Sequence, residues 1–295
     1  PWALHTGLST ESLFSATMAK IVAFTVEMVG LPLVRGGSYK IVEAFKRIIE
    51  KKGGECKVHQ QVTKIVTEGS KAVGVQTLDG NTYEGDHIIA NVTPTQLYGN
   101  LLNQVPQKIL TQAKNYKYGK GNMQIHLILN EKPHWFDEEL STVTYAHLSN
   151  GIDDISRAVN EAQNQMLPAK ATICIAQPTA VDPSRAPEGK HVLWIQLPEC
   201  PNFPKADAGG ALNHLTRGEW TEELREAYAD KILDRISQYI ENINTATIAR
   251  KVISPKDLEG MNINLVHGDP YSGQCEMDQY LLWRPLPSVK NHETP

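Results

Sequence analysis

The glycines Gly36 and Gly37 stand directly before a helix-like run, the position at which phosphate-binding loops place their glycines. A dinucleotide or triphosphate loop also needs a preceding buried strand and a spacing such as G-x-G-x-x-G. Residues 31–35, Leu-Pro-Leu-Val-Arg, supply neither, and the second candidate, Gly119-Lys-Gly, precedes a strand-like run. The sequence therefore contains no self-sufficient nucleotide loop.

Hydrolytic and metal-binding patterns are also missing from the sequence. It has no G-x-S-x-G nucleophile elbow and no H-E-x-x-H zinc pattern. Its four cysteines form no C-x-x-C pair, and His126 and His267 carry no diagnostic spacing. We predict no metal site, and no residue is assigned as catalytic.

Composition indicates a globular chain without the positive net charge that attracts nucleic acids or anionic lipids. The 295 residues are 41% hydrophobic, enough for one large domain or two ordinary ones. Lysine and arginine total 29 against 33 acidic residues, which disfavours nucleic acid as a partner. Scattered cysteines and the lack of a signal peptide favour the cytoplasm, and the first residue, Pro1, suggests that the chain was cut from a longer one.

The most apolar window, residues 13–34, contains Lys20 and Glu27 and is interrupted by Pro32, so a membrane-spanning helix is not expected. Its apolar residues repeat at helical spacing over residues 11–29. This amphipathic helix could pack on the protein's own core, cover an apolar substrate channel, or touch a membrane surface.

The remaining periodicities alternate between helix and strand. Helices are predicted at residues 38–53, 94–102, 106–113, 153–166 and 219–241, and a long surface loop at 198–218. Strands are predicted at residues 56–59, 62–69, 71–80, 82–91, 123–130, 141–148, 172–178, 191–198 and 247–253. Such an order predicts an α+β or mixed α/β fold, with a mixed sheet and flanking helices.

Two stretches resemble a known family. Residues 35–94, RGGSYKIVEAFKRIIEKKGGECKVHQQVTKIVTEGSKAVGVQTLDGNTYEGDHIIANVTP, resemble the central segment of phytoene-dehydrogenase-like flavoproteins, relatives of carotenoid desaturases and, more distantly, of flavin amine oxidases. Residues 253–287, ISPKDLEGMNINLVHGDPYSGQCEMDQYLLWRPLP, resemble the segment before that family's terminal flavin motif. PWALHTGL at the start is similar to the usual entry into the substrate domain.

The resemblance implies the substrate domain of a two-domain flavoprotein whose Rossmann part is largely absent from residues 1–295. Residues 34–100 would border the cofactor, 101–260 would bind substrate, and 261–295 would return toward the C-terminal flavin motif. The family's glycine-rich motifs do not occur in this sequence, so we expect the chain alone to bind FAD weakly or not at all.

The resemblance also implies site residues. The implied cofactor contacts fall in three places: the turn before the helix at residues 38–53, the strand that would face the adenine, and a later turn. The residues are Gly36, Gly37, Val62, Asn91 and Pro94. Substrate-facing positions fall near the end of the chain: Asp269, Tyr271, Gln279 and Trp283. For each of these residues, packing or a plain turn is an alternative explanation.

The function implied is FAD-dependent hydride transfer from an apolar, polyene-like or lipid-like substrate. Two alternatives remain: a non-catalytic module that binds an apolar ligand or a protein, and an amine-oxidase-type flavoenzyme. Peripheral membrane contact is compatible with the amphipathic helix. The sequence leaves open the exact substrate and the oligomeric state.

Overall fold

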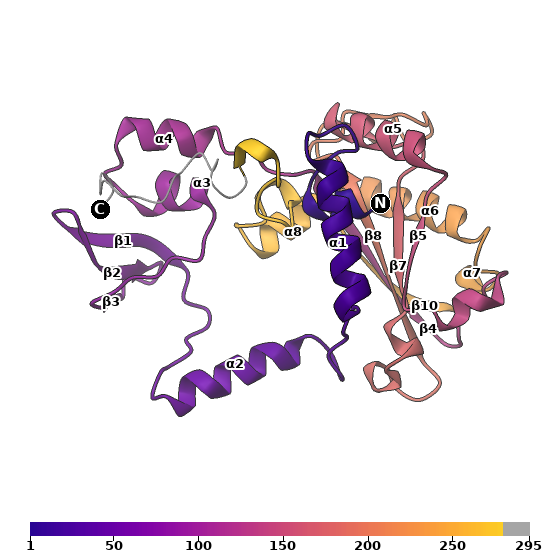
Figure 1. Ribbon diagram of the computed structural model, residues 1–295, viewed down its shortest axis with the longest axis horizontal. Helices are drawn as coiled ribbons and strands as arrows, with labels where there is room; N and C mark the ends of the chain where they lie inside the picture. The colour runs from indigo at the N-terminus through magenta and orange to yellow at the C-terminus, as the bar shows by residue number, and fades with distance from the viewer. Residues whose placement is uncertain (280–295) are drawn as a thin grey trace. The chain divides into compact units, whose positions relative to one another are not determined.

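The computed structural model describes residues 1–279 and divides into two compact units (Figure 1). Unit 1 comprises Pro1–Glu43 and Gly119–Tyr271. Unit 2 comprises Ala44–Tyr118 and continues from Ser272. Each unit is described by itself below.

Unit 1 is built on a five-stranded sheet with the order β10-β4-β8-β7-β5 (Figure 1). Every neighbouring pair in it is antiparallel, which differs from the mixed sheet expected from the sequence. The helix between β5 and β7 returns the chain to the sheet in the antiparallel direction. The strands are β4 (Gly121–Leu129), β5 (Tyr145–Leu148), β7 (Ile173–Ala176), β8 (His191–Cys200) and β10 (Thr247–Ile253).

One face of this sheet, the inner face, forms the main core. Alternate residues of the central strands are fully buried on it, because side chains along a strand point to opposite faces in turn. The inner-face residues include Met123, Ile125, Leu127, Leu129, Ile173, Ile175, Leu193, Ile195 and Leu197. Burial of each such side chain contributes about 1.5–3 kcal/mol.

Helix α6 (Glu222–Ile236) packs against the inner face. Its first turn is capped by the Thr221 hydroxyl, which accepts a hydrogen bond from the backbone N–H of Leu224. The negative charges of Glu222 and Glu223 in the same turn interact favourably with the positive end of the helix dipole. The buried stripe of the helix is Leu224, Tyr228, Ala229, Ile232, Leu233 and Ile236.

Shorter elements complete unit 1. Helix α5 (Ile152–Gln163) packs Ile155 and Val159 against Leu4 of the 3-10 helix η1 (Trp2–Thr6). The other elements are α1 (Ser15–Val29), β6 (Met166–Leu167), β9 (Ala206–Asp207), α7 (Ile243–Ala246) and α8 (Pro255–Met261), with single 3-10 turns between them.

Helix α1 confirms the amphipathic helix that the sequence predicts, but most of its apolar stripe is exposed. Met18 is buried, whereas Phe24, Met28 and Val29 are about two-thirds exposed. Within the described residues, no helix combines the length and apolarity needed to cross a membrane.

Helix α2 (Tyr39–Lys51) follows the glycine pair and runs across the boundary between the units. Gly36 and Gly37 have φ of +79° and +120°, and the Gly37 N–H donates to the Val34 carbonyl, which makes a tight turn. The helix ends at a glycine with φ of +82°, Gly53. The predicted turn, helix and glycine stop are therefore confirmed.

Unit 2 contains an antiparallel sheet of β1 (Val62–Glu68), β2 (Lys71–Thr77) and β3 (Thr82–Glu84). Helix α3 (Pro94–Gln96), the π-helical turn η2 (Leu97–Leu101) and helix α4 (Gln107–Lys114) follow. The hairpin at Asp79-Gly80-Asn81 forms as predicted, and the Asp79 carboxylate accepts from the Asn81 N–H and the Thr77 hydroxyl.

Three sequence predictions of secondary structure are wrong in part. Residues 56–59 and 85–91 are rich in β-branched and apolar residues but are not strands, because no neighbouring strand among the described residues supplies ladder hydrogen bonds. The predicted loop 198–218 begins inside β8 and contains β9, which pairs in parallel with β6. The mixed α/β class itself is confirmed.

Candidate functional site

The opposite face of the five-stranded sheet, the outer face, carries a different set of side chains. Its residues alternate with those of the inner face along the same strands and include a polar and aromatic group: Gln124, His126, Tyr145, His147, Cys174, Trp194 and Gln196. Cys174 lies directly opposite His147 on one side and Gln196 on the other, so the register of three strands aligns these groups in one row.

Hydrogen bonds link the outer-face side chains across strands. The Trp194 indole N–H donates to Gln124 Oε1 at 3.3 Å, and the Tyr145 hydroxyl donates to Gln196 Oε1 at 3.4 Å. The Tyr145 ring lies 5.0 Å from the His147 ring in a T-shaped arrangement. The two hydrogen bonds join different strands, the ring contact lies within β5, and together they fix side-chain orientation on the sheet.

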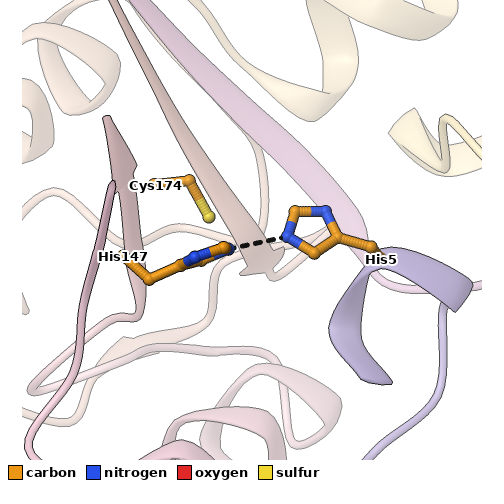
Figure 2. Close-up of side chains that lie close together, drawn as sticks. All are labelled: His5, His147 and Cys174. Carbon is orange, nitrogen blue, oxygen red and sulfur yellow. Dashed lines mark hydrogen bonds between the residues drawn. The ribbon is translucent and has the colours of Figure 1, made fainter. Parts of the chain in front are cut away.

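Figure 2 shows the most closely packed part of this face, where three side chains from separate segments converge. His147 comes from β5, Cys174 from β7 and His5 from η1. The two imidazoles share a hydrogen bond between their Nε2 atoms at 2.8 Å. Trp2 covers the pair, with its ring 5.0 Å from that of His147.

Burial keeps the side chains around His147 and Cys174 uncharged near neutral pH. Desolvation, with repulsion from His5, lowers the pKa of His147 to about 4, so its imidazole is neutral. Desolvation raises the pKa of the Cys174 thiol to about 12 and also raises the pKa values of the Tyr145 and Tyr271 hydroxyls. The face is therefore suited to bind an apolar molecule with a few neutral hydrogen-bonding groups.

Asp269 and Tyr271, two of the predicted substrate residues, lie close together in unit 1. The Asp269 carboxylate is fully buried and accepts hydrogen bonds from the backbone N–H groups of Gly119, at 2.7 Å, and Tyr271, at 2.8 Å. A Cβ atom at Gly119 would lie 3.0 Å from that carboxylate. Asp269 thus ties the chain before β4 to the segment of Tyr271, and the Tyr271 hydroxyl hydrogen bonds to Gln196 of the outer face.

Gln279 belongs to unit 2 and is buried there. Its amide pairs with the backbone of Lys117, accepting from the N–H at 2.5 Å and donating to the carbonyl at 2.8 Å. Through these bonds the Gln279 side chain stabilises the backbone around Lys117. Its assignment to a substrate site stays a prediction. Trp283 lies outside the described residues.

Three predicted cofactor residues lie on elements of unit 2. Val62 begins β1, Asn91 is exposed, and Pro94 is the first residue of α3. A pocket of about 250 Å³ in the same unit is bordered by residues of mostly apolar type: Ile65, Ala72, Ile88, Ala90, Leu97, Tyr98 and Leu102. The three predicted residues do not line it, and their role stays a prediction.

The other two predicted cofactor residues, Gly36 and Gly37, lie in a braced turn of unit 1. The Gly36 N–H donates to the Asp182 carboxylate at 2.7 Å, and Arg185 bonds both Asp182 and the Val34 carbonyl. A carboxylate on the glycine amide leaves that amide unavailable to a phosphate. The finding agrees with a turn that starts a helix, and cofactor contact by this pair stays a prediction.

Comparison with known proteins identifies the family. Residues 3–272 match the family described as flavin containing amine oxidoreductases. The chain belongs to that family. It is 24% identical over 258 residues to the 4,4'-diapophytoene desaturase of a Methylomonas species, covering 87% of this chain and 47% of that protein.

Other members give a consistent result. Identity to the lycopene-forming phytoene desaturase of a Paracoccus species is 24%, over 95% of this chain and 53% of that one. A solved structure from Pyrococcus furiosus superposes with a TM-score of 0.51 at 17% identity, covering 99% of this chain and 65% of that one, which shows the shared fold. The chain spans about half the length of the desaturases it matches, and the resemblance to phytoene-dehydrogenase-like flavoproteins is confirmed.

Sequence analysis missed most of the outer face. Its only signal was the alternation in β4 and β8, where Gln124, His126, Trp194 and Gln196 interrupt apolar runs. Alternation shows which residues share a face but not which strands become neighbours, so the convergence of His5, His147 and Cys174 had no sequence signature.

Proposed function

We propose that this chain forms the substrate-binding part of an FAD-dependent oxidoreductase that removes hydride from an apolar, polyene-like substrate. The observation that supports this most is the outer face of the five-stranded sheet. A rigid sheet there carries aromatic and neutral polar side chains, while the apolar packing of the domain is on the other face. The desaturase names of two relatives point to the same substrate class.

The residues present fit part of an FAD site. The pocket of unit 2 could take a flat adenine ring between its aliphatic side chains and exposed polar groups, and we propose that the backbone at Val62, with Asn91 and Pro94, receives the adenosine half. The glycine turn at Gly36 and Gly37 would border the cofactor. A glycine-rich pyrophosphate loop is not found in residues 1–279. When bound, the flavin supplies the hydride acceptor.

The outer-face residues would bind, orient and dehydrate the substrate. Trp194, Tyr145 and Tyr271 offer ring surface to an apolar chain, and burial keeps both tyrosine hydroxyls protonated. The hydrogen bonds from Trp194 to Gln124 and from Tyr145 to Gln196 hold the rings in place. Binding of this kind requires no ionised acid or base.

The first test uses the protein from its complete gene. A yellow product that releases FAD on denaturation, and whose flavin is reduced anaerobically by phytoene or 4,4'-diapophytoene, supports the proposal. If benzylamine reduces the flavin and the polyenes do not, the protein is an amine oxidase and the polyene proposal is wrong. If the product is colourless and does not take up added FAD, the remaining hypothesis is the non-catalytic binding module.

A substitution on the outer face tests where the substrate binds. Trp194→Leu removes ring surface and a hydrogen bond, and we expect KM to rise about tenfold with a smaller change in kcat, because binding is lost more than chemistry. Phe136→Leu is the matched control, since Phe136 is an exposed aromatic residue of unit 1 that follows β4 and whose backbone N–H donates to the Tyr239 carbonyl. Equal kinetic changes in the two variants would argue against the outer face.

We also propose a cytoplasmic protein with peripheral membrane contact through α1. The exposed apolar side chains Phe24, Met28 and Val29 could reach lipid, the phase that holds apolar substrates. Flotation with phosphatidylcholine vesicles tests this. Binding that survives Phe24→Asp together with Met28→Asp would argue against α1 as the contact.

A further inference from the structure

His5, His147 and Cys174 form a cluster that the proposed hydride chemistry does not use. One imidazole nitrogen from each histidine and Sγ of the thiol all lie within 4.8 Å of one another. Two residues are half-buried and one is buried, so the cluster is sheltered but reachable. We propose that these three side chains bind a single divalent metal ion of the zinc class.

The donor atoms select the metal. A thiolate with two imidazoles is the ligand set of borderline ions such as Zn²⁺, whereas Mg²⁺ and Ca²⁺ prefer oxygen ligands. Two further aromatic rings, those of Trp2 and Tyr145, each lie 5.0 Å from the His147 ring and contribute no strong ligand atom. Three protein ligands leave a fourth position for water or another small ligand.

The spacing suits coordination after small movements. In a tetrahedral site with Zn–N bonds of about 2.0–2.1 Å, two nitrogen ligands stand about 3.3 Å apart. The Nε2 atoms of His5 and His147 now lie 2.8 Å apart, sharing one proton in a hydrogen bond. An ion bound by the three side chains would displace that shared proton and also the Cys174 thiol proton, which passes to solvent. It would separate the two rings by about half an ångström, which side-chain rotation supplies.

The scaffold holds the ligands at two points. His147 and Cys174 are directly paired residues of β5 and β7, so their Cβ positions are fixed by the sheet. His5 comes from η1, whose Leu4 is buried against Ile155 and Val159 of α5. The Tyr145 hydroxyl lies near the Cys174 thiol and would orient the sulfur as an outer partner of the site.

The sequence predicted no metal site because its ligands are too far apart in the chain to form a pattern. His5 and His147 are separated by 142 positions. Only the strand order and the return of η1 to the sheet bring them together.

Metal binding tests the proposal directly, whatever the reaction catalysed. The complete protein, stripped with EDTA, is titrated with Co²⁺, and the difference spectrum against the metal-free sample removes any flavin absorption. We expect one Co²⁺ per chain with a thiolate-to-cobalt band in the near ultraviolet, and displacement of the Co²⁺ by Zn²⁺. Wild-type protein without this band would overturn the proposal.

Variants identify the ligands. Cys174→Ser should abolish the band. His5→Gln or His147→Gln should raise the Kd for Co²⁺ by about 10- to 100-fold. His126→Gln, a histidine of the same face outside the cluster, and Cys56→Ser, an exposed cysteine of unit 2, should leave the titration unchanged.

If circular dichroism shows that Cys174→Ser does not fold, the double variant His5→Gln, His147→Gln decides. The proposal requires that this variant lose the rise in Tm that Zn²⁺ gives the wild type. An unchanged rise, or a cobalt band that persists in Cys174→Ser, would place the metal elsewhere.

Discussion

The two faces of the five-stranded sheet use the same strands for opposite purposes. On the inner face, Met123, Ile125 and Leu127 are completely buried under α6. On the outer face, Gln124 and His126, their immediate neighbours in the chain, are only half-buried and polar. The apolar core and the face proposed to bind substrate are thus formed by neighbouring residues of the same strand.

The strongest test of this comparison substitutes one isoleucine on each face of β4. Ile125 is fully buried and Ile128 is 45% exposed. Ile125→Ala should lower the free energy of unfolding by about 2–5 kcal/mol, since it removes core contacts and leaves a cavity. Ile128→Ala should cost less than about 1 kcal/mol. Urea unfolding of both variants gives the values, and equal losses would refute the asymmetry of the faces.

Glu199 of β8 is the exception that sharpens the comparison, because it is a carboxyl group buried in the core. Burial raises its pKa to about 7, and the nearby Lys120 only partly offsets this. Glu199 Oε1 accepts from the Thr172 N–H, and within residues 1–279 Oε2 has no hydrogen-bond partner. Tyr228 of α6 and Cys200 lie close enough to sense its charge.

The pH dependence follows from the sign of this shift. A folded-state pKa above the unfolded value of 4.5 means that folding takes up a proton, so the contribution of Glu199 to stability falls as pH rises from about 4.5 to 7. The loss is about 3 kcal/mol. Glu199→Gln should remove this slope and be the more stable protein at pH 8. Unfolding curves at pH 5 and 8 measure it, and an unchanged slope would contradict the assignment.

Asp269 is expected to have the next largest effect. It accepts two backbone hydrogen bonds while fully buried, so Asp269→Asn, which has only one acceptor oxygen, should destabilise unit 1 by about 1–3 kcal/mol. Asp278→Asn is the comparison, because its ion pair with Lys117 is largely exposed and should contribute less than about 1 kcal/mol. Thermal unfolding ranks the two, and the reverse order would show that Asp269 is not a structural brace.

The smallest effect is expected for His126→Gln on the outer face. The side chain is half-buried and pairs with no inner-face residue, so the change in unfolding free energy should stay below about 1 kcal/mol. A larger loss, measured by the same urea method, would mean that the outer face carries stability as well.

Local sequence patterns predicted the elements well where the chain itself supplies the cause. The glycine turn, α2 and its glycine stop, the hairpin at Asp79, and β10 follow from propensity and turn chemistry. Residues 56–59 failed because a strand exists only when a neighbour pairs with it, and propensity does not encode the neighbour.

The site was predictable only through the family resemblance, and only in part. Asp269 and Tyr271 do lie together beside the sheet, yet Asp269 is occupied with backbone hydrogen bonds. The cluster of His5, His147 and Cys174 depends on the order in which distant strands assemble, which periodicity along a single strand cannot reveal.

The alternation of faces has a consequence for insertions and deletions. At the start of β4 the register slips between Gly121 and Met123, where one residue of β4 stands opposite two of β8. One extra residue directly after Met123 would exchange the two faces over the rest of the strand, placing Gln124 and His126 under α6 and Ile125 on the outer face. Homologous genes should therefore keep the lengths of β4 and β8 constant.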